Sequence, residues 1–126
     1  MRNLKIVAVV LVLLLGASFF SFSYISRSAR TLTAQLGRVE RSVQDGKWQE
    51  AGNELKTAQT SWEKTKYWWT ILLNHQEIDN IDISMSRVQK YIETKGAVLS
   101  LGELSTLRML VDHVSDNEAF NVRNIL

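Results

Sequence analysis

The sequence contains no proline and no cysteine, and only six of its 126 residues are glycine. Proline and glycine are the residues that most often interrupt helices and form turns, so their scarcity predicts a few long helices. Without cysteine, neither a disulfide bond nor a thiol nucleophile is available. A glycine-rich phosphate loop and a serine-elbow motif are also missing. We therefore expect no enzymatic activity and no cofactor.

Charge is absent from one long stretch, because no charged residue occurs between Lys5 and Arg27. The apolar run from Ile6 to Ile25 would reach roughly 30 Å as a helix, which is the thickness of a bilayer core. A cleaved signal peptide is the alternative, with Gly16-Ala17-Ser18 as its cleavage site. The run continues past that site through three phenylalanines and Tyr24, so we favour an uncleaved single-pass anchor.

The orientation of this anchor is not decided by the positive-inside rule, because basic residues flank both of its ends. Arg2 and Lys5 precede the run, and Arg27 and Arg30 follow it. A very short basic N-terminal tail usually stays in the cytoplasm. We therefore expect residues 1–26 to anchor the chain in the cell membrane, with residues 27–126 forming one domain outside the cytoplasm.

The net charge of the chain is only +2, and no concentrated basic stripe is present. This pattern disfavours nucleic acid as a partner. The half from Arg27 to Lys66 carries eight basic and five acidic residues, whereas the following half has the reverse excess. The basic half could face anionic lipid headgroups, or it could simply be a solvated helix surface.

Beyond the anchor, apolar residues recur every three or four positions, which predicts an all-α domain with four antiparallel helices. The anchor helix should run on to about Asp45 and end at Gly46, a residue suited to a left-handed cap. A second helix should start at Lys47 and end around Trp69–Leu73. The apolar seam of the first helix is short, so packing within its own domain is favoured, and self-association as a short coiled coil is the alternative.

Two capping boxes predict where the last two helices begin. The first pairs Asn74 with Glu77, and the second pairs Ser100 with Glu103. Leu99 and Leu104 are placed to form a hydrophobic staple beside the second box. We further expect a short extra turn from Ser115 to Glu118, and a tail, Phe120–Leu126, that docks its apolar residues on the bundle.

The best candidate for a binding site is the stretch from His75 to Asp82. On a helix, His75, Asp79 and Asp82 share one face, and an imidazole with two carboxylates could bind a divalent metal. Helix capping and ion pairs with Arg27, Arg30 or Arg38 explain the same residues more simply. No second ligand cluster supports a metal site, so we predict His75, Glu77, Asp79 and Asp82 as interaction residues.

Aromatic residues at the end of the second helix form a second candidate surface. If two antiparallel helices turn at Gly46, Trp69 lies level with Ser23, near the end of the apolar run. Tyr24, Tyr67, Trp68 and Trp69 are therefore predicted at the membrane interface, where Trp and Tyr are favoured. Core packing explains both tryptophans about equally well. Trp68 is the better membrane candidate, because it lies off the apolar face of its helix.

The short anchor, the tryptophan-rich second helix, Asn74-His75-Gln76-Glu77-Ile78-Asp79 and the terminal Asn124-Ile125-Leu126 together resemble a known family. It is catalogued as domain of unknown function 4363 (DUF4363) and consists of small membrane-anchored proteins of Gram-positive, often spore-forming, bacteria. The resemblance implies no reaction and no ligand. It implies a role in the cell envelope, beside a partner such as a small multi-pass membrane protein.

Two classes of function follow from the sequence. The first is a membrane-tethered module whose helical bundle docks on another membrane protein or on its own copy. The second is a ligand- or cation-sensing domain that uses the His75–Asp82 face. The anchor, the polar cluster and the missing catalytic motifs favour the first class.

Overall fold

The structure, a computed structural model, describes the backbone of residues 1–125 and the side chains of residues 1–117. It contains four α-helices: α1 (Arg2–Gln44), α2 (Trp48–Leu72), α3 (His75–Glu93) and α4 (Ala97–Ile125). The predicted all-α class is confirmed, as are the ends of the first two helices near Asp45 and Leu73.

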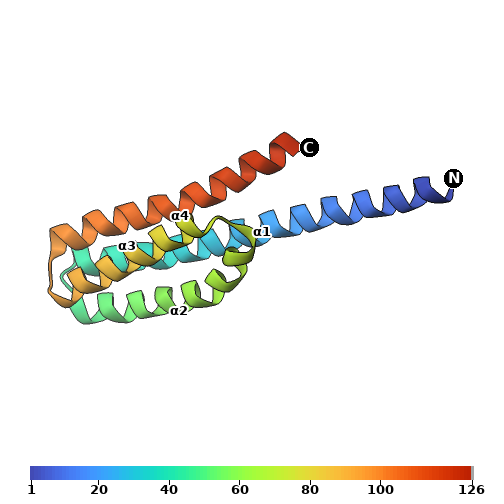
Figure 1. The fold of residues 1–126 in the computed structure, drawn as a ribbon. Helices are drawn as coiled ribbons and strands as arrows, with labels where there is room; N and C mark the ends of the chain where they lie inside the picture. The colour runs from blue at the N-terminus through green and yellow to red at the C-terminus, as the bar shows by residue number, and fades with distance from the viewer. Residues whose placement is uncertain (126) are drawn as a thin grey trace.

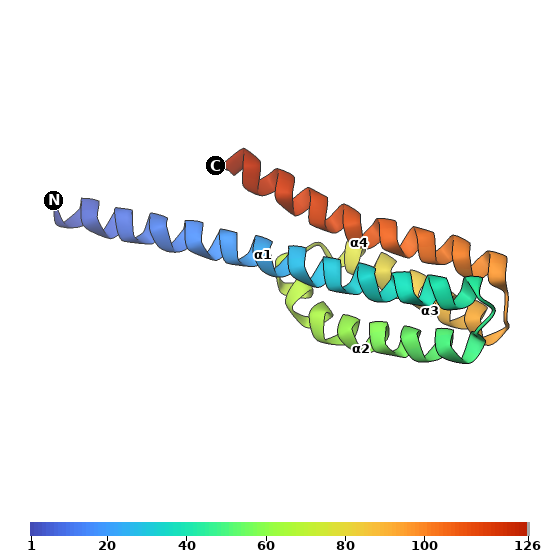
Figure 2. The same ribbon diagram turned by 180° about the vertical axis from the view of Figure 1, so that it is seen from behind.

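The helices form an up-down-up-down bundle from which the first half of α1 projects alone (Figures 1 and 2). Both α1 and α3 pack against α2 and α4, so α1 and α3 lie diagonally opposite each other. We call the end where α1 leaves the bundle the proximal end, and the opposite end the distal end. The α1–α2 and α3–α4 turns are distal, whereas the α2–α3 turn is proximal.

Helix α1 changes its surroundings along its length without a break in its backbone. Every residue from Met1 to Phe20 is exposed, and this part of α1 is long and apolar enough to cross a membrane, as predicted. The second half presents a buried stripe at helical spacing: Ile25, Ala29, Leu32, Leu36, Val39 and Val43. One helix therefore supplies both the candidate membrane span and a quarter of the bundle.

Two tryptophans of α2 join three helices in the core. The rings of Trp62 and Trp69 meet edge to face, with centroids 5.5 Å apart and planes at 88°, a favourable aromatic arrangement. Trp69 Nε1 donates to Ser28 Oγ on α1 at 3.1 Å, and Trp62 Nε1 donates to Asp82 Oδ1 on α3 at 2.7 Å. Both buried indole N–H groups are thus satisfied, each by a different helix.

The distal turns close through left-handed residues. Gly46 has φ of 71°, so the predicted left-handed position after α1 is confirmed. At the other distal turn the left-handed residue is Lys95, with φ of 57°, and not the glycine that follows it. The backbone N–H of Gly96 then donates to the carbonyl of Tyr91 at 2.9 Å and closes the end of α3.

The predicted capping box at Ser100 and Glu103 is wrong, because α4 begins at Ala97. Nothing after Gly96 breaks the helix, so it extends back to the turn, and the N–H of Ser100 donates to the Gly96 carbonyl. Ser100 is fully buried, and its Oγ has no hydrogen-bond partner. Glu103 instead accepts a hydrogen bond from Ser84 Oγ of α3 at 2.9 Å.

The hydrophobic staple is wrong for the same reason, since Leu99 is exposed whereas Leu104 is buried. The extra turn expected from Ser115 to Glu118 is also wrong, because α4 runs on unbroken to Ile125. The predicted docking of Phe120–Leu126 concerns side chains that lie outside the described part of the chain.

Truncation of Leu107 should test the core. Leu107 is fully buried, so Leu107→Ala should lower the free energy of unfolding by about 2–5 kcal/mol. The measurement is chemical unfolding of the full chain in detergent micelles, followed by near-ultraviolet circular dichroism. The matched control is Leu99→Ala, the same change at an exposed position of the same helix. Equal effects of the two variants would contradict the packing described here.

Ser100→Ala distinguishes the observed start of α4 from the capping box. Because the Ser100 hydroxyl is buried without a partner, its removal should raise the free energy of unfolding by about 1 kcal/mol. If Ser100 capped the helix, the same change would cost about 1 kcal/mol. The sign of the change, measured in the same unfolding assay, decides between them. Ser105→Ala at an exposed position of α4 corrects for helix propensity.

Candidate functional site at the proximal end

Three features gather at the proximal end of the bundle: the exit of α1, the end of α2 and the first turn of α3 (Figure 1). Asn74 precedes α3, and its side chain accepts a hydrogen bond from the backbone N–H of Gln76 at 2.9 Å. The predicted start of α3 at Asn74 is therefore confirmed, but the predicted pairing with Glu77 is wrong, because Asn74 accepts from Gln76 and the Glu77 side chain extends toward α4. Glu77 adds a negative charge to the first turn of α3, the positive end of the helix dipole.

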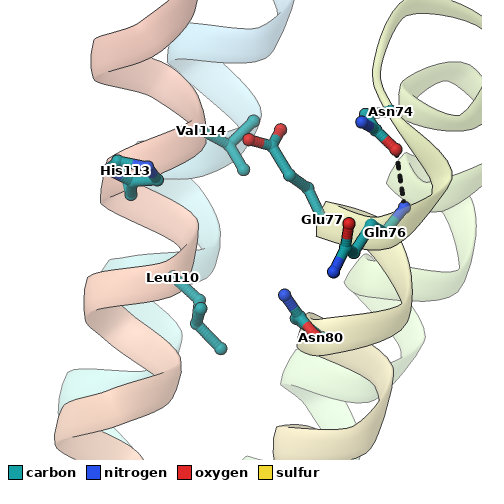
Figure 3. A pocket seen from close by; sticks show the side chains of 7 residues that line it. All are labelled: Asn74, Gln76, Glu77, Asn80, Leu110, His113 and Val114. Carbon is teal, nitrogen blue, oxygen red and sulfur yellow. Dashed lines mark hydrogen bonds between the residues drawn. The ribbon is translucent and has the colours of Figure 1, made fainter.

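A small polar pocket separates this first turn of α3 from α4 (Figure 3). Its volume is about 240 Å³. Figure 3 shows Glu77 extending from α3 toward Val114 of α4, with His113 at the preceding position of that helix. The pocket is lined by Asn74, Gln76, Glu77, Asn80, Leu110, His113 and Val114.

His113 also lines this pocket, although no motif in the sequence marks it as a site residue. Its position can be predicted by counting residues from the turn at Lys95–Gly96. Helices that run antiparallel from that turn bring Glu77 level with residues 113–114. His113 Nε2 lies 3.1 Å from Asn117 Nδ2 on its own helix.

The four predicted interaction residues do not form one site. His75 and Asp79 are exposed, Glu77 lines the pocket toward α4, and Asp82 faces α2. Asp82 Oδ1 accepts from Trp62, and Asp82 Oδ2 lies 2.6 Å from Lys66 Nζ. Within residues 1–117, no group of three His, Cys, Asp or Glu side chains could hold a metal ion.

The ion pairs predicted between this cluster and Arg27, Arg30 or Arg38 are wrong: Asp82 pairs with Lys66, and none of these arginines forms an ion pair among the described side chains. The reason is the order of helices around the bundle. Helix α3 neighbours α2 and α4, and α1 lies across the diagonal. The hydrogen bond to Asp82, together with the negative charge of Asp82, Glu63 and Asp79, raises the pKa of Lys66 above its usual value of 10.5.

The second feature of the proximal end is an apolar groove between α1 and α2. Its volume is about 430 Å³, and we call it the proximal groove. Its walls are Phe20, Ser21 and Tyr24 on α1, and Trp68, Ile71 and Leu72 on α2. Tyr67 stands beside the groove, with its ring edge to face with Trp68 at 5.4 Å.

Of the four predicted interface aromatics, Trp69 is placed differently from the prediction, because it is fully buried. Its indole meets Ser28, about one helical turn farther along α1 than the expected Ser23. Side chains lean toward the N-terminus of their own helix. In an antiparallel pair the two leans oppose each other, so contacting residues lie nearer the turn on α1 than symmetry about Gly46 predicts.

Tyr67 and Trp68 are more than half exposed, at 66% and 53%. Tyr24 is partly buried against the core. These three residues lie at the proximal end of the bundle, where the apolar run of α1 ends. Their membrane contact is still a prediction.

Fold and site together define a class: a four-helix bundle built on the extension of a long apolar helix, without a recognisable catalytic constellation among the described residues. The family model "Domain of unknown function (DUF4363)" matches residues 19–125. The chain belongs to this family, which confirms the resemblance seen in the sequence. Searches of curated proteins and of solved structures give no match.

Two substitutions at Asp82 should separate its two interactions. Asp82→Ala leaves the buried Trp62 N–H without an acceptor and should cost about 1–3 kcal/mol of unfolding free energy. Asp82→Asn keeps an acceptor and loses only the ion pair with Lys66, which is partly exposed, so it should cost less than about 1 kcal/mol. Equal losses would contradict the role assigned to the indole hydrogen bond.

The pH dependence of the unfolding free energy tests the ion pair between Asp82 and Lys66 a second time. The pKa of Lys66 is raised in the folded state, so the contribution of the ion pair is fully present below pH 10.5 and is lost as the pH rises through the folded pKa. The difference between wild type and Asp82→Asn should therefore be constant near neutral pH and shrink above pH 10.5. Asp79→Asn, at an exposed carboxylate of the same helix, is the control.

Proposed function

We propose that the chain is a membrane-anchored, non-catalytic interaction module of the bacterial cell envelope, whose bundle docks on another membrane protein. The observation that carries the proposal is the continuity of α1. Its exposed apolar half and its buried core stripe belong to one unbroken helix. An apolar surface of that length requires a bilayer or an equally apolar partner.

The junction between anchor and bundle supports a close approach to the membrane. No glycine or proline occurs between Gly16 and Gly37, so α1 contains no hinge residue where it leaves the bundle. Ser28 Oγ donates to the carbonyl of Tyr24, and Ile25 is fully buried one turn before Ala29. The bundle is thereby held at a fixed distance from the span, with its proximal end toward the lipid.

The α3–α4 face is the proposed docking surface. It combines the polar pocket with exposed groups of both helices, including His75, Asn80 and His113. Protein interfaces combine an apolar centre with a polar rim, and here the apolar Leu110 and Val114 lie among five polar lining residues. Because the face lies at the proximal end, the partner that reaches it is a protein of the same membrane, such as a small multi-pass protein.

Cation sensing by the His75–Asp82 face has weaker support. Asp82 is occupied by Lys66 and Trp62, and Glu77 faces a different neighbour from His75 and Asp79. A cation would have to break the Asp82 pairs before it gained two carboxylates. We therefore keep docking as the proposed function.

Membrane insertion and orientation are tested by labelling. The chain has no cysteine, so Ser105→Cys at an exposed position of α4 gives a single reporter. We expect the chain to stay in the membrane after carbonate extraction, and the reporter to react with a membrane-impermeant maleimide in intact cells. Release by carbonate would contradict the anchor, and labelling only after lysis would reverse the orientation.

Docking is tested by photocrosslinking in the native membrane. A photoreactive amino acid replaces Asn80, which lines the pocket, and in the control it replaces Asn53, an exposed asparagine of α2. We expect a discrete crosslinked membrane protein from position 80 and none from position 53, identified by mass spectrometry. A crosslink to a second copy would make self-association the docking event. No adduct from position 80, in a chain that remains membrane-bound, would contradict docking through this face.

A further inference from the structure

We propose that the proximal groove, together with Arg27 and Lys64, binds one anionic phospholipid of the bilayer that α1 spans. This inference rests on the membrane anchoring in the proposed function, and it adds a ligand and a site. The groove receives part of an acyl chain, and the two cations hold the phosphate at the membrane surface.

The groove has the chemistry of an acyl-chain site. Five of its six lining residues are apolar or aromatic, and its volume of about 430 Å³ lies in the range of small-ligand pockets. Phe20, Trp68 and Ile71 keep 73%, 53% and 63% of their surface exposed. In water, so much clustered apolar surface is unfavourable. Contact with lipid hydrocarbon removes the same surface from water, which is favourable.

The position of the groove identifies the bilayer as the source of its occupant. The α1 wall, Phe20 to Tyr24, belongs to the last turns of the apolar run that ends at Ile25. The groove is therefore continuous with the span and opens where hydrocarbon gives way to headgroups. Tyr24 and Trp68, one on each wall, are of the residue types that favour this depth.

Each wall of the groove leads to a cation one helical turn farther from the bilayer. On α1, Phe20, Tyr24 and Arg27 follow spacings of four and three, so they lie along one flank of the helix. On α2, Lys64 precedes Trp68 by four residues and Ile71 by seven, which gives the same arrangement in the opposite chain direction. On both helices, apolar groove residues are thus followed by a basic residue one turn farther from the bilayer.

Both cations are available to a ligand. Arg27 and Lys64 are exposed, and in the part of the chain with described side chains neither forms an ion pair within 4.0 Å. Lys66, two positions along α2, is by contrast held by Asp82. At about 1.5 Å per residue, Arg27 stands about 4.5 Å beyond Tyr24 and Lys64 about 6 Å beyond Trp68. This height suits the phosphate of a lipid whose chain occupies the groove.

The charge pattern selects an anionic lipid over a zwitterionic one. The attraction between one basic residue and an anionic membrane surface is about 1 kcal/mol, which corresponds to about a fivefold preference for an anionic lipid. Two such residues at one groove should enrich an anionic lipid there by more than tenfold over a zwitterionic lipid at the same mole fraction.

The experiment measures which lipid lies against Trp68. The full chain is reconstituted in phosphatidylcholine vesicles that carry the same low fraction of either dibrominated phosphatidylglycerol or dibrominated phosphatidylcholine. The contribution of Trp68 is the difference in fluorescence between wild type and Trp68→Phe, because three other tryptophans are present. We expect brominated phosphatidylglycerol to quench Trp68 at a more than tenfold lower fraction than brominated phosphatidylcholine.

The double variant Arg27→Gln/Lys64→Gln should lose this preference and keep the quenching by brominated phosphatidylcholine. The matched control is Arg38→Gln/Lys56→Gln, which removes the same charges from exposed positions of the same two helices farther from the groove. This control should keep the preference. Quenching of the Trp68 signal thus reports on the groove, and the control separates a local site from a general effect of positive charge.

Three outcomes overturn the inference. Equal quenching by both lipids shows that Trp68 touches the bilayer without a selective site, and the membrane anchor of the proposed function survives. A preference that persists in Arg27→Gln/Lys64→Gln removes the two cations from the site. A chain that carbonate releases from the vesicles and that neither lipid quenches overturns both the proposed function and this inference.

Discussion

The structure depends on the unbroken backbone of α1 at the point where its exposed apolar run ends and its buried stripe begins. From Met1 to Phe20 every residue of the helix is exposed, and from Ile25 onward one of its faces is fully covered. A break between these parts would leave the bundle free to tilt and would dissolve the proximal groove, since one wall of the groove is the last part of the apolar run. The same helix therefore determines where the domain sits and what its proximal end can touch.

The tryptophan pair of α2 fixes the remaining helices relative to α1. Trp62 and Trp69 contact each other, and their indole N–H groups reach α3 and α1 respectively. Alanines at positions 51 and 58 of the same face let the helices approach closely. Large and small residues alternate along this face, so the bulk of two indole rings is accommodated in a bundle with few residues.

The positions of the helices could be predicted from the sequence better than the contacts between them. Helix spacing and a left-handed Gly46 located α1 and α2, and Asn74 located the start of α3, because these are local properties of the backbone. The start of α4 was misplaced, since Ser100 matches a capping pattern that only burial can contradict. The partner of Asp82 was misjudged for another reason: which helices are neighbours is decided by packing around the whole bundle. The pocket residue His113 was missed because its place in the pocket depends on the packing of α4 against α3.

The position of α4 beside α1 bears on how the domain is made. Arg108 Nη1 lies 2.7 Å from Glu40 Oε2, and Thr33 donates to Asp112 at 3.2 Å, so the contacts that close the bundle join residues 68 and 79 positions apart. Synthesis delivers α1 first and α4 last. Until α4 arrives, the stripe of Leu32, Leu36 and Val39 has only part of its cover. The nascent domain thus has an open seam, and its last helix must be complete before the ring of four helices can close.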